Sequence, residues 1–396
     1  MVFLAGGPAQ GGGAGKMQAD ALAVGIKSGD AYVMQVQKVG QQLVRGTAAG
    51  LAEVLKVCRK PGTAVVPARA QPVLDVTGLA RRPGVRPGQV GGERNSLPIQ
   101  RPCWCRCCCG GVPDEPGRGG IRPTMIDCMM PTDDEARRKE IVDELVIESV
   151  DRGITRFIST HPDQDHVQGL KYLDSRMGLL NFYCVKNAAT KDDPTEDFKH
   201  YCTLRDDPKK AFYINKGCSR RWMNQSSEER GGAGINILWP DTTNTDYREA
   251  LEAAERGESP NNTSAIIEYS LKGGVTALWM GDLETEFMEE IDGHVALPKV
   301  DLLFAPHHGR ESGRVPDAWL RQTDPTVIVL GEAQAEHMWY YPGWDTITQN
   351  SAGDITFDCR SGVVDVYVSS PIYDVDFLYD AHASANLDRY IGSFNV

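Results

Sequence analysis

From about residue 124 onwards, short apolar runs alternate with stretches in which apolar residues recur at helical spacing. Residues 135–150 show that spacing most clearly, with Ile141 and Leu145 one turn apart and Thr132 or Asp133 available to cap the first turn. The predicted helices cover residues 135–150, 166–173 and 284–291. The predicted strands cover residues 154–158, 235–239, 265–271, 275–280, 300–305, 326–330, 354–357 and 363–368. This alternation predicts a layered α/β fold, and taken alone it also suits a doubly wound sheet.

The segment of residues 37–123 differs from the rest of the chain in pattern and in charge. It holds 14 Lys plus Arg against 5 Asp plus Glu, a net charge of +9. Residues 1–36 are balanced, so residues 124–396 carry −21 within a total of −12. Pro-Gly and Gly-Gly pairs interrupt the segment, and we expect a low-complexity, disordered insertion. Two interpretations stay open, a faulty gene model and a basic arm for nucleic acid.

The cysteine and glycine clusters of the N-terminal part do not indicate a site. Six of the 11 cysteines lie in residues 37–123, and five of them crowd into residues 103–109. That spacing is too tight for a tetrahedral zinc site built from separated Cys-x-x-Cys pairs. Residues 11–17 lack the first Gly and the final Ser or Thr of a phosphate-binding loop. The chemistry is therefore expected in residues 124–396.

The overall composition is that of a protein that can bury a full core. Of 396 residues, 41% are hydrophobic and 24% are charged. No run of about 18 apolar residues occurs, so we expect no membrane span. The apolar start, residues 1–5, is too short for a signal peptide, and we expect a cytoplasmic location.

A cluster of polar residues follows the predicted strand of residues 154–158. His161, Asp163, Asp165 and His166 place two imidazoles and two carboxylates within six residues. Such groups suit one or two divalent cations. A surface loop rich in Asp and His, or the cap of a short helix, would show the same composition.

Two further predicted strands end in candidate ligands. The strand of residues 275–280 leads to Asp282, and the strand of residues 300–305 leads to His307 and His308. Ligand sites in layered α/β folds lie beyond the carboxyl ends of strands. We therefore expect three strand ends to converge on one metal site.

In combination, these three clusters resemble the metallo-β-lactamase fold, and most closely the ComEC-type hydrolase domain of DNA-uptake proteins. The motifs that carry the resemblance are His161-x-Asp163-x-Asp165-His166, Gly281-Asp282 and His307-His308-Gly309. Weaker matches lie at residues 28–36, 125–128 and 261–264. The resemblance implies an αββα sandwich, with two mixed β-sheets between helical layers. It also implies N-terminal strands in residues 1–36, the insertion in residues 37–123 and a hydrolase domain in residues 124–396.

The expected ligand roles follow from charge and from this resemblance. Asp282 is expected to bridge two ions, because a carboxylate has two oxygens to share. The expected metal ligands are His161, Asp163, Asp165, His166, Asp282, His307 and His308, with Asp165 and His308 as catalytic residues. Asp163 replaces a His of the wider family, and this harder ligand shifts the expected ion from zinc alone towards manganese or magnesium as well. The family's additional His ligand has one candidate here, His200.

The expected reaction is hydrolysis by a metal-activated water, because no motif for a Ser or Cys nucleophile occurs. The resemblance favours a phosphodiester in DNA or in a nucleotide. The charge of −21 opposes a polyanion except in a local basic channel, to which Arg310 and Arg314 could contribute. Two alternatives stay open, a thioester or lactam hydrolase of the same fold and a metal-binding scaffold without turnover.

Overall fold

A computed structural model describes the chain in several segments. They are residues 2–5, 22–26, 107–108, 122–149, 153–226, 232–271, 273–331, 339–383 and 388–396. The chain divides into two compact units, residues 1–39 with 100–396 and residues 40–99, and every described residue lies in the first. The predictions for residues 11–17, for residues 28–36 and for most of residues 37–123 lie outside the described residues.

The first sheet is largely parallel. Its strands are β1 (Val2–Ala5), β4 (Arg122–Ile126), β6 (Arg156–Ser159), β7 (Phe182–Cys184) and β8 (Ala211–Tyr213), in that order, with β3 (Cys107–Cys108) also paired to β4. Strands β4, β6, β7 and β8 run parallel to one another, whereas β1 and β3 join β4 antiparallel. Every residue of β6 and β7 is buried, as expected for parallel strands covered on both faces.

The second sheet is mixed. Its strands are β14 (Thr346–Thr348), β13 (Val327–Leu330), β12 (Leu302–Phe304), β11 (Thr276–Trp279), β10 (Ile266–Ser270) and β9 (Ile235–Trp239), in that order. Strands β9, β10 and β11 are antiparallel neighbours, and β11 to β14 run parallel. The parallel strands β11 and β12 therefore present their carboxyl ends at one edge of the sheet.

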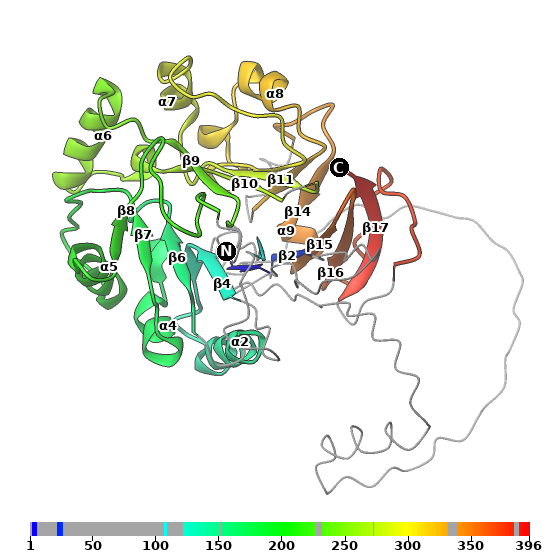
Figure 1. Cartoon of the computed structure of the whole chain (residues 1–396), viewed down its shortest axis with the longest axis horizontal. Coiled ribbons are helices and arrows are strands. Elements are labelled where there is room, and N and C mark those ends of the chain that lie inside the picture. Colours follow the sequence, from blue (N-terminus) through cyan, green and yellow to red (C-terminus); the bar gives the residue numbers. More distant parts are fainter. Residues whose placement is uncertain are drawn as a thin grey trace, which may run out of the picture. The chain divides into compact units, whose positions relative to one another are not determined.

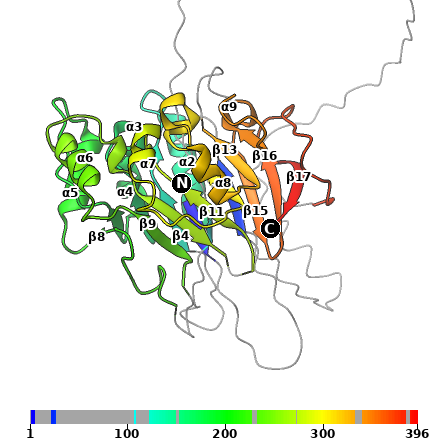
Figure 2. The same ribbon diagram turned by 90° about the horizontal axis from the view of Figure 1, so that it is seen from above.

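A third, antiparallel sheet contains β2 (Leu22–Ile26), β15 (Ile355–Arg360), β16 (Val363–Val368) and β17 (Arg389–Asn395). The predicted strands of residues 354–357 and 363–368 belong to this sheet as β15 and β16. A two-residue turn at Ser361 and Gly362 folds them into a hairpin, and β2 and β17 pair with its two edges. Figure 2 shows β15, β16 and β17 together at one end of this unit.

Helices cover the outer faces of the first two sheets. Figure 1 shows α2, α4 and α5 outside the first sheet and α7 and α8 outside the second. The helices are α2 (Glu135–Glu148), α3 (Gln164–Val167), α4 (Leu170–Met177), α5 (Glu196–Asp206), α6 (Thr245–Glu255), α7 (Thr285–Glu290), α8 (Asp317–Thr323) and α9 (Gln349–Ala352). Three 3₁₀ turns, η1 (Asn261–Thr263), η2 (His307–Gly309) and η3 (Glu311–Gly313), and a short strand, β5 (Cys128–Met129), complete the loops.

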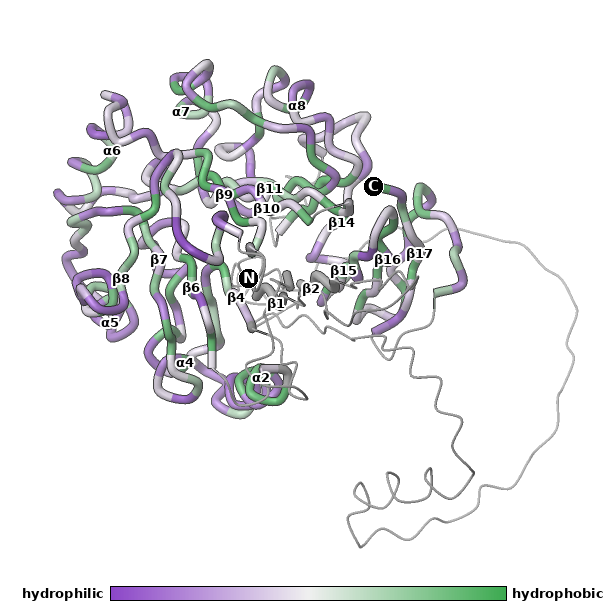
Figure 3. Tube along the Cα trace, in the orientation of Figure 1, coloured by the Kyte–Doolittle hydropathy of each residue, from purple (hydrophilic) through white to green (hydrophobic). Residues whose placement is uncertain are grey.

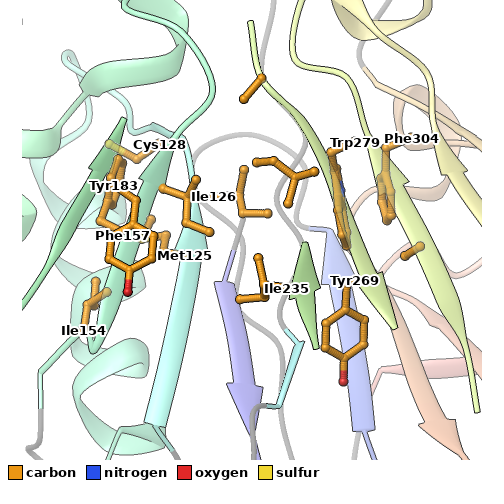
Figure 4. Packing of buried hydrophobic residues seen from close by; sticks show 14 of the residues in the cluster. Met125, Ile126, Cys128, Ile154, Phe157, Tyr183, Ile235, Tyr269, Trp279 and Phe304 are labelled. Atoms are coloured by element: carbon orange, nitrogen blue, oxygen red, sulfur yellow. The ribbon is translucent and has the colours of Figure 1, made fainter. Parts of the chain in front are cut away.

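Alternation along β11 and β12 builds two hydrophobic layers. Trp279 and Phe304 point toward the first sheet and share a hydrophobic cluster with Met125 of β4 (Figure 4). Their rings stack on each other with centroids 4.7 Å apart. Leu278 and Leu303 point the other way and pack in the cluster that includes α7 and α8. The apolar stretches follow the strands, and the peripheral helices and loops are mostly hydrophilic (Figure 3). The expected α/β fold with sheets between helical layers is therefore confirmed.

Most predicted elements lie where the pattern placed them, and boundaries differ by a few residues. The strand of residues 235–239 matches β9, and the helix of residues 135–150 ends at Glu148, with Asp134 as its cap instead of Thr132 or Asp133. The helix of residues 166–173 is divided into α3 and α4, because Gly169 adopts a left-handed φ of 87°. In the described part of the chain, no helix is both long and apolar enough to cross a membrane.

Candidate metal centre

Three strand ends meet at one site, as the motifs predict. The loop after β6 carries His161, the loop after β11 carries Asp282, and the turn after β12 carries the paired histidines. Backbone hydrogen bonds tie these loops together. The Ala265 N–H donates to the Thr160 carbonyl at 3.1 Å, and the His307 N–H donates to the Gly281 carbonyl at 3.0 Å. Backbone hydrogen bonds between loops of the two sheets therefore hold the site together.

Asp282 lies at the centre of a group of imidazoles. Its Oδ1 is 3.0 Å from His166 Nε2, and its Oδ2 is 3.5 Å from His308 Nε2. The Nε2 atoms of His161 and His307 each lie 3.9 Å from the same Oδ2. The Asp282 side chain is only 4% exposed, so its charge depends on these neighbours for compensation.

Asp165 joins the same group from the start of α3. Its Oδ2 is 3.3 Å from His308 Nε2, and its Oδ1 is 3.9 Å from His166 Nε2. One donor atom from each of Asp165, His166, Asp282 and His308 lies within 4.8 Å of the other three. Two imidazoles and two carboxylates at this spacing form a ligand set suited to a divalent metal ion.

Two buried nitrogen atoms indicate that the site is built for a further group. The Nε2 atoms of His161 and His166 are buried and make no hydrogen bond of good geometry within the described residues. A buried polar atom left unsatisfied in this way is costly. A cation bound to such a nitrogen would remove that cost, so the residues present fit a metal ion.

The buried carboxylates and imidazoles of the site shift one another's pKa values. Burial opposes charge on Asp282, yet the His166 and His308 imidazoles hold its pKa well below the usual value. Burial would lower the pKa of His308, but Asp282 and Asp165 raise it to about 9. His161 behaves differently, because burial and the charge of His166 lower its pKa to about 4. His161 is therefore neutral at pH 7, which is the form that binds metals.

Asp127, at the end of β4, orients the site, and motif reasoning did not place it there. Its Oδ2 lies 2.9 Å from His166 Nδ1. It also accepts hydrogen bonds from the Thr160 N–H at 2.7 Å and the Thr160 hydroxyl at 2.6 Å. A carboxylate behind a ligating imidazole fixes its orientation and its tautomer. The signals in the sequence are weak: an Asp directly after an apolar strand, within the weaker match of residues 125–128.

The paired histidines have different surroundings. His308 belongs to the four-residue group, whereas His307 Nδ1 lies 2.9 Å from Ser312 Oγ and its Nε2 lies 3.3 Å from Arg310 Nη1. Both histidines have left-handed backbone angles, with φ of 49° and 59°. Such strain in non-glycine residues is characteristic of functional sites. The structure thus favours His308 over His307 as the ligand.

Asp163 lies apart from the four-residue group. Its carboxylate accepts a hydrogen bond from the Gln164 N–H at 2.7 Å and forms an ion pair with Lys191. Burial raises the pKa of Asp163, but His161 and Lys191 together bring it below the ordinary value. Asp163 is thus near His161 and is charged, with Lys191 as its partner.

The remaining histidines lie elsewhere. His200, the candidate for the additional ligand, has its Nε2 3.0 Å from Asp174 Oδ2 and does not join the group. His382 is exposed and pairs with Asp380. His337 lies outside the described residues. His200 as the candidate for the family's additional ligand therefore has no support in the geometry.

Comparisons with known proteins find similar solved structures, two of which are as follows. No family model and no curated protein matches the chain. The metallo-β-lactamase fold protein YhfI from Bacillus subtilis is 12% identical, with a TM-score of 0.29, over 61% of this chain and 93% of that one. Igni18, a metallo hydrolase from Ignicoccus hospitalis, is 15% identical, with a TM-score of 0.31, over 52% and 79%. These scores are too low to support an assignment, so function has to be inferred from the chain's own residues.

Proposed function

We propose that this protein is a metal-dependent hydrolase. The observation that carries the proposal is the position of Asp282, whose carboxylate lies within 3.0–3.9 Å of four imidazoles from two other segments of the chain. Four buried or half-buried donors at this spacing would be unfavourable as a purely structural cluster, because charged groups lose their hydration. Together, Asp165, His166, Asp282 and His308 would hold the ion.

A divalent ion in this position would lower the pKa of water from about 15.7 to about 7 and so supply a nucleophile at neutral pH. The residues around it have their own roles. Asp165 has one carboxylate oxygen facing His308, and its second oxygen can orient the attacking water. Asp127 keeps the Nε2 of His166 directed at Asp282. His307, outside the donor group, would contact the substrate.

The substrate we propose is a phosphodiester, in DNA or in a nucleotide. Arg310 supports this, because its Nε and Nη2 are buried and have no hydrogen-bond partner within the described residues. Its Nη1 lies 3.3 Å from His307 Nε2, so the guanidinium would lie beside the proposed metal centre. A planar guanidinium donates in pairs to phosphate oxygens. The acidic body limits binding to a short stretch of polyanion near this arginine.

Hydrolysis of a small chromogenic phosphodiester and of linear single-stranded DNA would test the proposal. The purified chain is assayed with manganese, magnesium or zinc, beside Asp165→Ala and a control, Asp133→Ala, whose side chain is exposed. We expect activity that needs metal, survives in the control and falls at least 100-fold in Asp165→Ala, a typical loss for a positioned catalytic group. A metal-loaded protein without phosphodiesterase activity would overturn the proposal that the substrate is a phosphodiester. It would direct the search to thioesters and lactams, or to a scaffold role.

A further inference from the structure

An ion pair between Lys191 and Asp163 blocks the position where a second metal ion would need a ligand. Asp163 is the second residue of the loop motif, and its carboxylate is engaged by the Lys191 ammonium and by the Gln164 N–H. Both side chains are half-buried, with 25% and 31% exposed. Displacing the lysine to free this carboxylate for a cation would leave the ammonium beside that cation, and like charges repel.

The loop that carries Lys191 is held in place. The Thr190 N–H donates to the Ala254 carbonyl at 3.1 Å, and the Thr190 hydroxyl donates to the Glu255 carbonyl at 2.8 Å. The Lys191 Nζ also lies 5.5 Å from the centre of the Phe198 ring, within the range of a cation–π contact. The ammonium is therefore fixed by its loop and by two side chains.

The donors left for a second ion are too few. Without Asp163, the loop offers His161, and Asp282 is the carboxylate that the two positions would share. His200 cannot add a third, because its imidazole pairs with Asp174. Catalytic zinc sites have three protein ligands as a rule. The first group, with four donors within 4.8 Å, meets that requirement, and the second does not.

The same lysine borders a small cavity beside the metal loop. This cavity has a volume of about 190 Å³, and its lining includes Pro162, Asp163, Lys191 and Ser259. Glu258, an acidic residue in the lining, is paired with Arg256 at 2.7 Å. An ammonium has three N–H donors, and Asp163 does not use all of them. The remaining donors can reach an oxygen of a bound anion in this cavity.

We propose that the centre binds one divalent ion and that Lys191 takes the place of a second, contacting an anionic oxygen of the substrate. This inference rests on the proposed metal-dependent function. It goes further, because it sets the number of bound ions at one and assigns a role to the positive charge of Lys191, a residue outside the motifs. It also removes Asp163 from the expected ligands.

Metal stoichiometry tests this directly, independently of activity. The chain is stripped of metal, titrated with manganese or zinc by calorimetry, and its metal content is measured after dialysis. We expect one equivalent in the wild type and in Asp163→Asn. In Lys191→Gln, which frees Asp163, we expect a second and weaker equivalent, which the double variant Lys191→Gln/Asp163→Asn should lose. Lys191→Arg and the exposed control Lys199→Gln should keep one equivalent.

The outcomes separate the two proposals. Two equivalents in the wild type, or an unchanged single equivalent in Lys191→Gln, would overturn the role of Lys191 and leave the hydrolase standing. Failure to bind any metal would overturn both. As a second measurement, KM for the phosphodiester should rise roughly 10- to 100-fold in Lys191→Gln and much less in Lys191→Arg, the loss expected for one charge-assisted hydrogen bond. An unchanged KM would refute the contact with substrate.

Discussion

The Nδ1 atom of His166 lies 2.9 Å from the Asp127 carboxylate, and both side chains are buried between the first sheet and the loop after β6. The opposite nitrogen of the same ring, Nε2, lies 3.0 Å from Asp282. One imidazole thus links a carboxylate that orients it to a carboxylate that shares the metal position. Because Asp127 also accepts two hydrogen bonds from Thr160, its own position is fixed by backbone and side chain.

Replacing Asp127 should therefore weaken metal binding without removing a ligand. In Asp127→Ala the His166 ring loses the partner that sets its orientation, and affinity should fall about 10- to 100-fold. Competition with a fluorescent chelator measures this affinity directly. Asp133→Ala, at an exposed position, is the matched control and should bind as the wild type does. Equal affinities for Asp127→Ala and the control would show that Asp127 has no such role.

The two adjacent histidines should respond differently to substitution. His308→Ala removes a donor from the four-residue group and should reduce metal affinity at least 100-fold, whereas His307→Ala should reduce it less than about tenfold. Titration of both variants by calorimetry distinguishes the two losses. The reverse order would mean that the turn rearranges when metal binds and that His307 is the ligand.

The residues of this site that could be predicted are those that stand in short sequence motifs. His161, Asp165 and Asp282 follow apolar runs within a few residues and belong to the specific motifs, so pattern and motif together located them. Asp127 also follows an apolar strand, but its contact with His166 could not be predicted, because that contact depends on the parallel pairing of β4 with β6, in which Ile126 lies opposite Ile158. Pairing between distant strands has no signature in a single stretch of sequence.

The same limit explains the parts of the fold that pattern reasoning missed. Strands β7, β8 and β14 have three residues each, too few for a periodicity to be seen. The third sheet depends on strands from both ends of the described chain, β2 and β17, meeting one hairpin. Lys191 stands in a loop 28 residues after its partner Asp163, and only the folded chain brings them together.

Removing the metal should lower the free energy of unfolding by an amount that grows with the logarithm of the metal affinity. An ion that binds only the folded state adds about 2.7 kcal/mol at a free concentration of 100 times its Kd. For about 300 folded residues the unfolding entropy is about 0.6 kcal/mol/K, so this should raise the unfolding temperature by roughly 4–5 °C. Thermal scans with manganese and with EDTA measure the difference. Asp282→Asn should show little or no shift, and an equal shift in this variant would place the stabilising ion elsewhere.

Gly281 should tolerate no side chain, since it shapes the turn that presents Asp282. Its φ is +54°, and a Cβ would lie 2.5 Å from Ser264 Oγ and 2.7 Å from Ser264 Cβ. Gly281→Ala should therefore destabilise the fold by about 2–4 kcal/mol, combining left-handed strain with a steric clash. Gly293→Ala is a matched control, because its φ is +80° with no atom within 4 Å of the Cβ, and it should cost only about 1 kcal/mol. Denaturant unfolding of both variants measures the costs, and equal costs would rule out the clash.

Far from the metal centre, Asp358 should make stability fall as pH rises. Burial raises the pKa of this carboxyl from 3.8 to about 6, with Arg360 partly offsetting the shift and Asp365 adding to it. Between pH 4 and pH 6 the folded state binds more protons than the unfolded state. The contribution of protonated Asp358 to the free energy of unfolding is therefore lost as pH rises through about 6. Asp358→Asn should remove the dependence and, since the side chain keeps some solvent contact, stabilise the protein by about 1–2 kcal/mol at pH 7.5 and little at pH 4. Urea unfolding at both pH values, with the exposed Asp376→Asn as control, measures the difference. A gain of the same size at pH 4 and pH 7.5 would show that removal of the charge is not its cause.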